Sequence, residues 1–289
     1  MRAPLGYARA SNLAEALCFL GDFGSVTAVL AGGTDLMIDL RAGDLRASYI
    51  LDISRLPELK VLELRGEEIH LGAGVTFSEI LSSDLLARCA PVLREAASTI
   101  GSRQVRNVAT IGGNVVHCSP CADSVPALLV HEAQVVLSSR EGERVLPLPA
   151  FLKGPYRNDR RPEELVTRFV LRAADGRFFQ FQKVARRREL ATARITLAIL
   201  AEQGAGGRIG SFRLALGSAT PSPLRIEAVE EFLMGKTPTE RDLWEAGRLL
   251  ALEMISISGL RPSTAYKEKA AQGLLVRALY PLVHHEPRP

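Results

Sequence analysis

Two short segments of this 289-residue chain place adjacent glycines beside a hydroxyl or acidic side chain, as phosphate-binding loops do. The first is AGGTD at residues 31–35, and the second is TIGGN at residues 110–114. Successive backbone N–H groups in a glycine-rich turn supply positive potential without steric bulk, which is what a diphosphate requires. Paired glycines also serve ordinary turns, so one such segment is weak support. Two of them on one scaffold predict a site that clamps a single ligand.

A competing nucleotide motif occurs in LGAGVTFSEI at residues 71–80. Gly72-x-Gly74 lies between a predicted strand and a predicted helix, which mimics the dinucleotide fingerprint. Phe77 occupies the third glycine position, however, and no acidic residue ends a second parallel strand at the expected spacing, since Glu95 lies in a predicted helix. We therefore favour a packed hairpin end over a Rossmann site.

Cys118 and Cys121 form a Cys-x-x-Cys pair beside His117. A metal site needs about four ligands, and no second pair accompanies this one. Cys18 and Cys89 stand alone at irregular spacing, which is typical of reduced thiols. We expect no bound metal, no iron–sulfur cluster and no disulfide, and the sequence leaves a redox role for Cys118 and Cys121 open.

Hydrolase chemistry is disfavoured, because Ser119 and Ser124 have only His117 and Asp123 as nearby partners and no Gly-x-Ser-x-Gly elbow occurs. The charge balance, 36 Lys and Arg against 32 Asp and Glu, disfavours a nucleic-acid surface. The one basic run, Arg186–Arg188, is expected to be a solvated face.

Membrane insertion and secretion are not predicted either. No run approaches the roughly 18 apolar residues of a membrane span. The first residues also lack the apolar core and cleavage site of a secretory signal. We expect a cytoplasmic protein.

The elements around the two glycine segments predict an α+β fold. A helix at 11–20 and a strand at 26–30 precede AGGTD; a helix at 85–100 precedes the second glycine loop, and Asp123 or Ser124 is expected to cap a short helix near Pro126. Thr76 and Glu79 have the spacing of a capping box. Further predicted strands and hairpins lie at 49–53, 59–74, 133–148, 165–171, 178–184, 195–200 and 212–216, with helices at 225–234, 239–253 and 264–282.

Read together, several segments resemble the FAD-binding medium subunits of the molybdenum hydroxylases, the family of xanthine dehydrogenase and carbon monoxide dehydrogenase. The segments lie at 29–36, 100–126, 181–199, 214–236 and 258–279. The resemblance implies a p-cresol-methylhydroxylase-type FAD-binding domain at 1–175, with α+β subdomains at about 1–55 and 56–175. A smaller α+β flavoprotein C-terminal domain would follow at 176–289.

The resemblance also implies which residues contact FAD. Backbone donors, with the hydroxyls of Thr34 and Thr110, would hold the pyrophosphate and adjoining sugar. The residues implied are Val29, Leu30, Ala31, Gly32, Gly33, Thr34, Asp35, Leu36, Thr110, Ile111, Gly112, Gly113 and Asn114. Asp123 would accept hydrogen bonds from ribose or ribityl hydroxyls, and Lys183 would approach the flavin ring, whose reduced anionic form a positive charge stabilises. The residues packing near the cofactor would be Ile100, Gly101, Val116 and Leu165.

The chain departs from the family pattern at two places. Ala191 or Thr192 stands where many relatives have an aspartate, as in the xanthine-dehydrogenase-like and nicotinate-type variants, and Gly259 stands where an aspartate is common. The cluster-binding loop of benzoyl-coenzyme-A-type relatives is missing. FAD is therefore the expected sole cofactor, with no catalytic side chain and no metal on this chain.

The resemblance implies an oxidoreductase subunit that relays electrons. A large partner subunit would carry the molybdenum cofactor and a small one the [2Fe-2S] clusters, in a dimer of heterotrimers. FAD would pass electrons to NAD, oxygen or another acceptor. The alternative is a self-contained flavin oxidase or reductase, which needs an acid–base residue that the sequence does not offer. The organic substrate would bind on a different polypeptide and cannot be read from this one.

Overall fold

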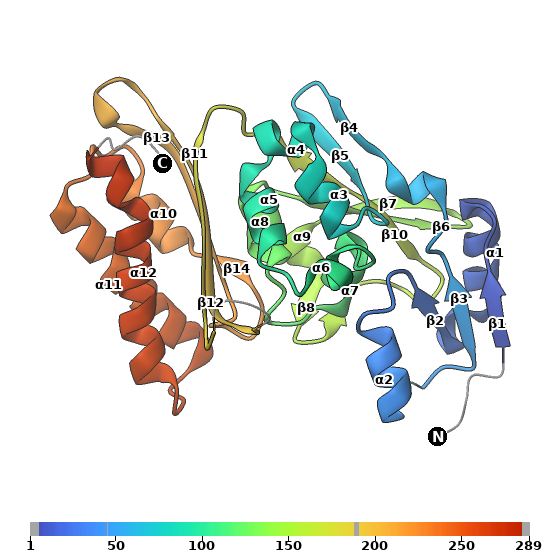
Figure 1. Ribbon diagram of the computed structural model, residues 1–289. Helices are drawn as coiled ribbons and strands as arrows, with labels where there is room; N and C mark the ends of the chain where they lie inside the picture. Colours follow the sequence, from blue (N-terminus) through green and yellow to red (C-terminus); the bar gives the residue numbers. More distant parts are fainter. Residues whose placement is uncertain (1–5, 45, 188–190, 285–289) are drawn as a thin grey trace. The chain divides into compact units, whose positions relative to one another are not determined.

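The computed structural model describes residues 6–44, 46–187 and 191–284. Its residues form two compact units, each built from separate stretches of the chain (Figure 1). Unit 1 contains the residues up to Leu86 together with Ile100–Ser119 and Glu132–Ala173. Unit 2 contains Ala87–Thr99, Pro120–His131 and the residues from Ala174 onward.

Unit 1 begins with a small parallel sheet in the order β1-β3-β2. Its strands are β1 (Gly6–Arg9), β2 (Thr27–Leu30) and β3 (Tyr49–Asp52). Helix α1 (Leu13–Phe23) joins β1 to β2, and the Asn12 side chain caps it by accepting a hydrogen bond from the Glu15 amide. The apolar stripe of α1 packs into a core with β3, so β2 is fixed and the glycine segment after it is positioned.

The second sheet of unit 1 is antiparallel, in the order β4-β5-β10-β6-β7. Its strands are β4 (Leu62–Arg65), β5 (Glu68–Gly72), β6 (Gln134–Ser139), β7 (Gly142–Pro147) and β10 (Leu165–Arg172). Gly66 turns the first hairpin with φ +60°, which confirms the predicted hairpin. A short antiparallel pair, β8 (Leu152–Gly154) and β9 (Arg157–Asn158), lies between β7 and β10 in the chain.

Short helices connect these strands. They are α2 (Leu36–Ala42), α3 (Phe77–Ser82), α4 (Asp84–Cys89), α6 (Arg103–Arg106), α7 (Ile111–His117) and α9 (Leu148–Phe151). The predicted capping box of α3 is confirmed: Thr76 Oγ1 accepts from the Glu79 amide at 3.2 Å, and Glu79 Oε2 accepts from the Thr76 amide at 2.6 Å. The predicted helix at 85–100 is divided, because Pro91 begins a new helix, α5 (Pro91–Ser98).

Unit 2 is a four-stranded antiparallel sheet in the order β11-β12-β13-β14, with helices on both faces. The strands are β11 (Phe178–Ala185), β12 (Ala193–Gln203), β13 (Ile209–Gly217) and β14 (Leu224–Arg225). One face packs on α10 (Glu227–Leu233), α11 (Glu240–Ser258) and α12 (Thr264–His284). The other face contacts α5 and α8 (Ser124–Val130).

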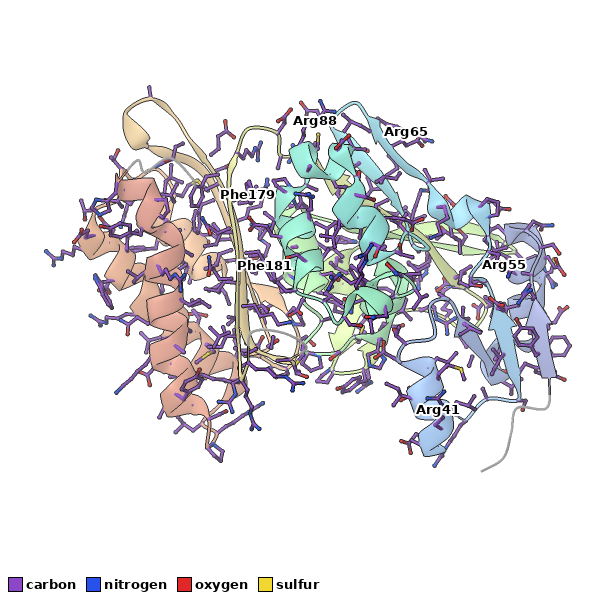
Figure 2. The ribbon with its side chains drawn as sticks, viewed as in Figure 1. Arg41, Arg55, Arg65, Arg88, Phe179 and Phe181 are labelled. Carbon is purple, nitrogen blue, oxygen red and sulfur yellow. The ribbon has the colours of Figure 1, made fainter. Side chains whose placement is uncertain are left out.

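Residues on β11 alternate between these two faces. Phe178 and Val184 pack toward α10–α12. Figure 2 shows Phe179 and Phe181 on the opposite side of the strand, the side that Lys183 shares because side chains repeat with a period of two. Together the units confirm the α+β class. None of the helices in the described ranges is long and apolar enough to cross a bilayer.

Candidate functional site

A cavity of about 1160 Å³ lies within unit 1. This volume is slightly above the roughly 300–1,000 Å³ of typical ligand pockets, so the cavity has room for a dinucleotide. Most of the predicted site residues line it. They are Val29, Ala31, Gly32, Gly33, Thr34, Asp35, Leu36, Ile100, Gly101, Thr110, Gly112, Gly113, Asn114, Val116 and Leu165. The structure therefore brings both glycine segments to one cavity.

Four predicted residues lie outside this lining. Leu30 and Ile111 are next to lining residues, and the Ile111 side chain is fully buried in the core. Asp123 and Lys183 belong to unit 2.

The first glycine segment lines the cavity and contains a row of backbone donors without protein acceptors among the described residues. Within the described ranges, no protein acceptor binds the amides of Gly32 to Leu36, although the carbonyls of Gly33 and Asp35 accept bonds from α2. Gly33 has φ +70°, a conformation that disfavours any side chain and lets the chain turn here. Unmet N–H groups on a cavity wall are suited to anionic oxygens.

The second glycine segment was expected to be a loop, but it forms the start of a helix. Residues 111–114 begin helix α7, and Thr110 caps that helix by accepting from the Gly113 amide at 3.1 Å. The amides of Ile111 and Gly112 donate to Val75 O and Ala73 O, both at 2.9 Å. The prediction of a second loop with bare amides is therefore wrong, because long-range carbonyls and the cap occupy these donors. The segment gives close backbone approach and the Thr110 hydroxyl instead.

The space around each glycine of the two segments shows what an added side chain would meet. A Cβ built on Gly32 would lie 2.1 Å from Val108 O, and one on Gly112 would lie 2.6 Å from Ala73 O. At both positions another backbone segment of the same chain passes so close that a side chain is excluded. A Cβ on Gly113 would meet only Thr110 Oγ1, at 3.1 Å. Gly113 is thus the position of the second segment where an added side chain meets no backbone in the described part of the chain, and only the Thr110 hydroxyl would have to give way.

The competing Gly72-x-Gly74 motif is also explained by packing. A Cβ on Gly72 would lie 2.2 Å from Leu59 O, and one on Gly74 would lie 3.0 Å from the same oxygen. The two glycines let the end of β5 pass over the 3-10 turn Pro57–Lys60. This agrees with the packed hairpin end that the sequence favours over a dinucleotide fingerprint.

Sequence reasoning missed several cavity residues. Tyr156 and His117 line the cavity with ring centroids 5.3 Å apart, and Arg160 lines it as well. Arg160 Nη1 donates to Glu164 O at 2.7 Å, and burial lowers the pKa of its guanidinium. Tyr156 and Arg160 fall in a segment rich in proline and charge, whose pattern predicts only a loop. An aromatic residue inside such a segment was the signal available.

Asp123 and Lys183 form a buried ion pair in unit 2. Lys183 Nζ donates to Asp123 Oδ2 at 2.5 Å and to Thr99 O at 3.0 Å. Asp123 Oδ1 is buried and has no hydrogen-bond partner in the described structure. Of the two predicted caps of α8, Asp123 or Ser124, Asp123 stands at the N-cap position, but its side chain bonds Lys183 and makes no capping bond. Burial raises the pKa of Asp123 despite the opposing effect of Lys183.

The Cys-x-x-Cys segment begins at the end of α7. Cys118 Sγ donates to Val115 O at 3.2 Å, and burial raises the pKa of this thiol to about 11. Among the residues that the structure describes, no group of three or more His, Cys, Asp or Glu side chains is arranged to hold a metal ion. Arg186 and Arg187 are exposed, whereas Arg188 lies outside the described residues.

Comparison with known proteins covers nearly the whole chain. Residues 3–171 match the FAD binding domain in molybdopterin dehydrogenase, and residues 180–282 match the CO dehydrogenase flavoprotein C-terminal domain. The chain is 33% identical to the glyceraldehyde dehydrogenase medium chain of Sulfolobus acidocaldarius, over 94% of this chain and 96% of that one. It is 29% identical to the carbon monoxide dehydrogenase medium chain of Hydrogenophaga pseudoflava, over 94% and 95%.

Solved structures show the same fold. The chain matches the structure of carbon monoxide dehydrogenase from Hydrogenophaga pseudoflava that lacks the Mo-pyranopterin moiety, with a TM-score of 0.89, 28% identity and 97% of each chain covered. Quinoline 2-oxidoreductase from Pseudomonas putida 86 gives a TM-score of 0.89 at 24% identity, covering 99% of each chain, and shows the fold alone.

These matches confirm an FAD-binding domain followed by a flavoprotein C-terminal domain. They also confirm FAD as the cofactor of this type of chain, with the molybdenum cofactor on other subunits of the complex. The chain belongs to the family of FAD-binding medium subunits of molybdopterin dehydrogenases, the oxidoreductases of the carbon monoxide dehydrogenase and xanthine dehydrogenase type.

Proposed function

We propose that this chain binds FAD in the cavity of unit 1 and relays electrons from [2Fe-2S] clusters of a partner subunit to an acceptor such as NAD. The observation that carries the proposal is the row of amides from Gly32 to Leu36, which belong to residues lining the cavity and have no protein acceptor in the described ranges. Bound FAD supplies the electron-transfer chemistry, and the chain supplies position, charge and exclusion of water.

We assign different parts of the cofactor to different residues of the cavity. The amides of Gly32 to Leu36 would bind the diphosphate, with the Thr34 and Thr110 hydroxyls beside them. Gly113 leaves room in the cavity lining, because a Cβ built there would meet only Thr110 Oγ1 within 4 Å. The apolar lining, Ile100, Val116 and Leu165, would pack against the sugar and rings. Asp123 and Lys183 remain proposed contacts of the flavin end.

The complex we propose is a dimer of heterotrimers in the cytoplasm, with an iron–sulfur small subunit and a molybdenum-cofactor large subunit. We also propose that residues 1–175, with subdomains of about 1–55 and 56–175, are the FAD-binding portion. Residues 176–289 would be the C-terminal flavoprotein domain. The boundaries of the two family matches, 3–171 and 180–282, support this division.

The first experiment is titration of the purified full chain, stripped of flavin, with FAD. We expect stoichiometric binding, and Gly113→Val should weaken it at least ten-fold, because a branched side chain would enter the cavity. Gly273→Val is the matched control: Gly273 also lies in a helix, α12, and a Cβ there meets nothing within 4 Å. Unchanged FAD affinity in Gly113→Val would show that the diphosphate binds elsewhere.

The second experiment separates the relay from the self-contained flavin enzyme. Native purification should yield iron and molybdenum in constant ratio to FAD, and the flavin should be reduced by substrate only in that complex. Substrate oxidation by the isolated, FAD-loaded chain would favour the self-contained enzyme and overturn the relay.

A further inference from the structure

Tyr156 presents an aromatic ring at the cavity. The residue is 63% exposed and lines the cavity. Pro155 and Tyr156 form the two-residue turn between β8 and β9, and the φ of +57° at Tyr156 is the value that the residue after a proline takes in such a turn. The turn thus holds the ring at the cavity without burying it in the core.

The segment carrying Tyr156 is tied to the end of α7. The Tyr156 amide donates to Cys118 O at 2.9 Å, and Asn158 Nδ2 donates to Val116 O at 2.8 Å. The ring then meets His117 edge to face, with an interplanar angle of 74°. One backbone hydrogen bond, one hydrogen bond from the Asn158 side chain and one ring contact thus fix an aromatic face that the protein core does not use.

His117 links this ring to the diphosphate segment. Its Nε2 lies 3.9 Å from Asp35 Oδ1, and Asp35 belongs to the row of unmet amides. In FAD the adenine is one ribose away from the diphosphate, whereas the isoalloxazine is separated from it by the longer ribityl chain. An aromatic platform directly beside the diphosphate segment therefore fits the adenine.

We infer that Tyr156, positioned by His117, stacks on the adenine of FAD and makes this site select the dinucleotide FAD over the mononucleotide FMN. The inference rests on the proposed FAD site in unit 1. Base stacking on an aromatic ring is sequence-tolerant and strong enough to change affinity by an order of magnitude. FMN has no adenine, so it cannot use the Tyr156 ring.

Tyr156→Gly tests this without damaging the fold, because glycine accepts the left-handed backbone at no cost. In the flavin-free full chain, we expect the Kd for FAD to rise about ten-fold while the Kd for FMN stays the same. Tyr156→Phe keeps the ring and should keep wild-type FAD affinity. Urea unfolding of Tyr156→Gly should show stability equal to or above that of the wild type.

Tyr280→Ala is the matched control. Tyr280 and His284 also form a tyrosine–histidine contact, with centroids 4.0 Å apart on α12, and neither lines the cavity. This variant should bind FAD and FMN as the wild type does.

The outcomes distinguish a failure of the proposed function from a failure of this inference. Wild-type protein that binds neither flavin would overturn the proposed function and this inference with it. Wild-type binding of FAD with no change in Tyr156→Gly would overturn the inference alone. Equal weakening of FAD and FMN would mean that the isoalloxazine, and not the adenine, lies on Tyr156, which also overturns it.

Discussion

The Cα of Gly32 lies so close to the carbonyl of Val108 that a Cβ added at Gly32 would be 2.1 Å from that oxygen. Gly32 belongs to the first glycine segment, Val108 lies two residues before the second, and both line the cavity. Their crossing fixes the distance between the glycine segments before any ligand binds. Gly32 is thus a structural requirement of unit 1 as well as a candidate ligand contact.

Gly32→Ala should destabilise the protein, because a backbone carbonyl cannot move aside as a flexible side chain can. We expect a loss of about 1–3 kcal/mol in the free energy of unfolding, the usual effect of overpacking, measured by urea denaturation. Gly273→Ala should raise stability by about 0.5–1 kcal/mol, since it is an open helical glycine. A Gly32→Ala variant as stable as the wild type would show that the crossing is not rigid.

The contacts of Asp52 on β3 with Tyr7 and Arg9 on β1 should make the stability of unit 1 sensitive to acid. Burial alone would raise the pKa of Asp52, but hydrogen bonds from Ser54, Tyr7 and Arg9 outweigh it and hold the pKa at about 2. A depressed pKa stabilises the fold above the unfolded-state value of about 4, and this stability is lost as pH falls toward 2. The contribution is roughly 2 kcal/mol.

Asp52→Asn should therefore lower stability at pH 7 and flatten its dependence between about pH 4 and pH 2. Urea midpoints across this range check the prediction. Asp22→Asn is the control, because Asp22 forms only an exposed pair with Arg140 and should change little. An unchanged acid profile in Asp52→Asn would contradict the role given to this carboxylate.

Removing one partner of the Asp123–Lys183 pair should lower the free energy of unfolding more than replacing both partners by apolar residues. Lys183→Met leaves a buried carboxylate without its partner, and we expect a loss of about 3–5 kcal/mol near neutral pH. Asp123→Leu with Lys183→Met should lose much less than the sum of the single changes. A double-mutant cycle by urea denaturation measures the difference, and additive losses would mean that the two charges are not coupled.

The same pair predicts a dependence on pH. Because the pKa of Asp123 is raised by burial, its ionised form is the one that the folded state penalises. Without Lys183 this penalty grows, so the defect of Lys183→Met should shrink as pH falls and Asp123 takes up a proton. A defect that is constant with pH would indicate lost packing instead of lost charge pairing.

The thiols should react at different rates. Burial raises the pKa of Cys118 to about 11, so few of its molecules are thiolate at neutral pH. Cys18 is exposed on α1. Iodoacetamide at pH 8 should label Cys18 first, Cys18→Ser should remove that fast phase, and Cys118 should react slowly until the protein unfolds. Fast labelling of Cys118 in the native protein would reopen a redox role for it.

Local patterns predicted much of the fold. The Thr76–Glu79 capping box and the turn at Gly66 depend on residues within a few positions, and the sequence displays those directly. The segment at 110–114 begins a helix whose first amides bind the carbonyls of Val75 and Ala73, which are distant in the chain. No local pattern reports such partners. Thr110 gave the available hint, because a threonine before Ile-Gly-Gly can cap a helix.

Composition pointed to the glycines of the candidate site but not to the other residues that line the cavity. Tyr156 and Arg160 enter the cavity through a segment whose sequence indicates only a loop. The Asp123–Lys183 contact joins residues 60 positions apart on a helix start and a strand. Pairing of this kind follows from the register of β11 and the placement of α8, which are properties of the assembled core.

The interleaving of the two units bears on the order in which the chain folds during synthesis. Helices α5 and α8 leave the ribosome well before β11, β12 and β13, the strands that cover their apolar sides. Their hydrophobic residues must stay exposed to solvent, or shielded by chaperones, until about a hundred more residues have been translated. A fragment ending near residue 175 would keep those helices without their covering sheet, so truncation there should yield an aggregating product.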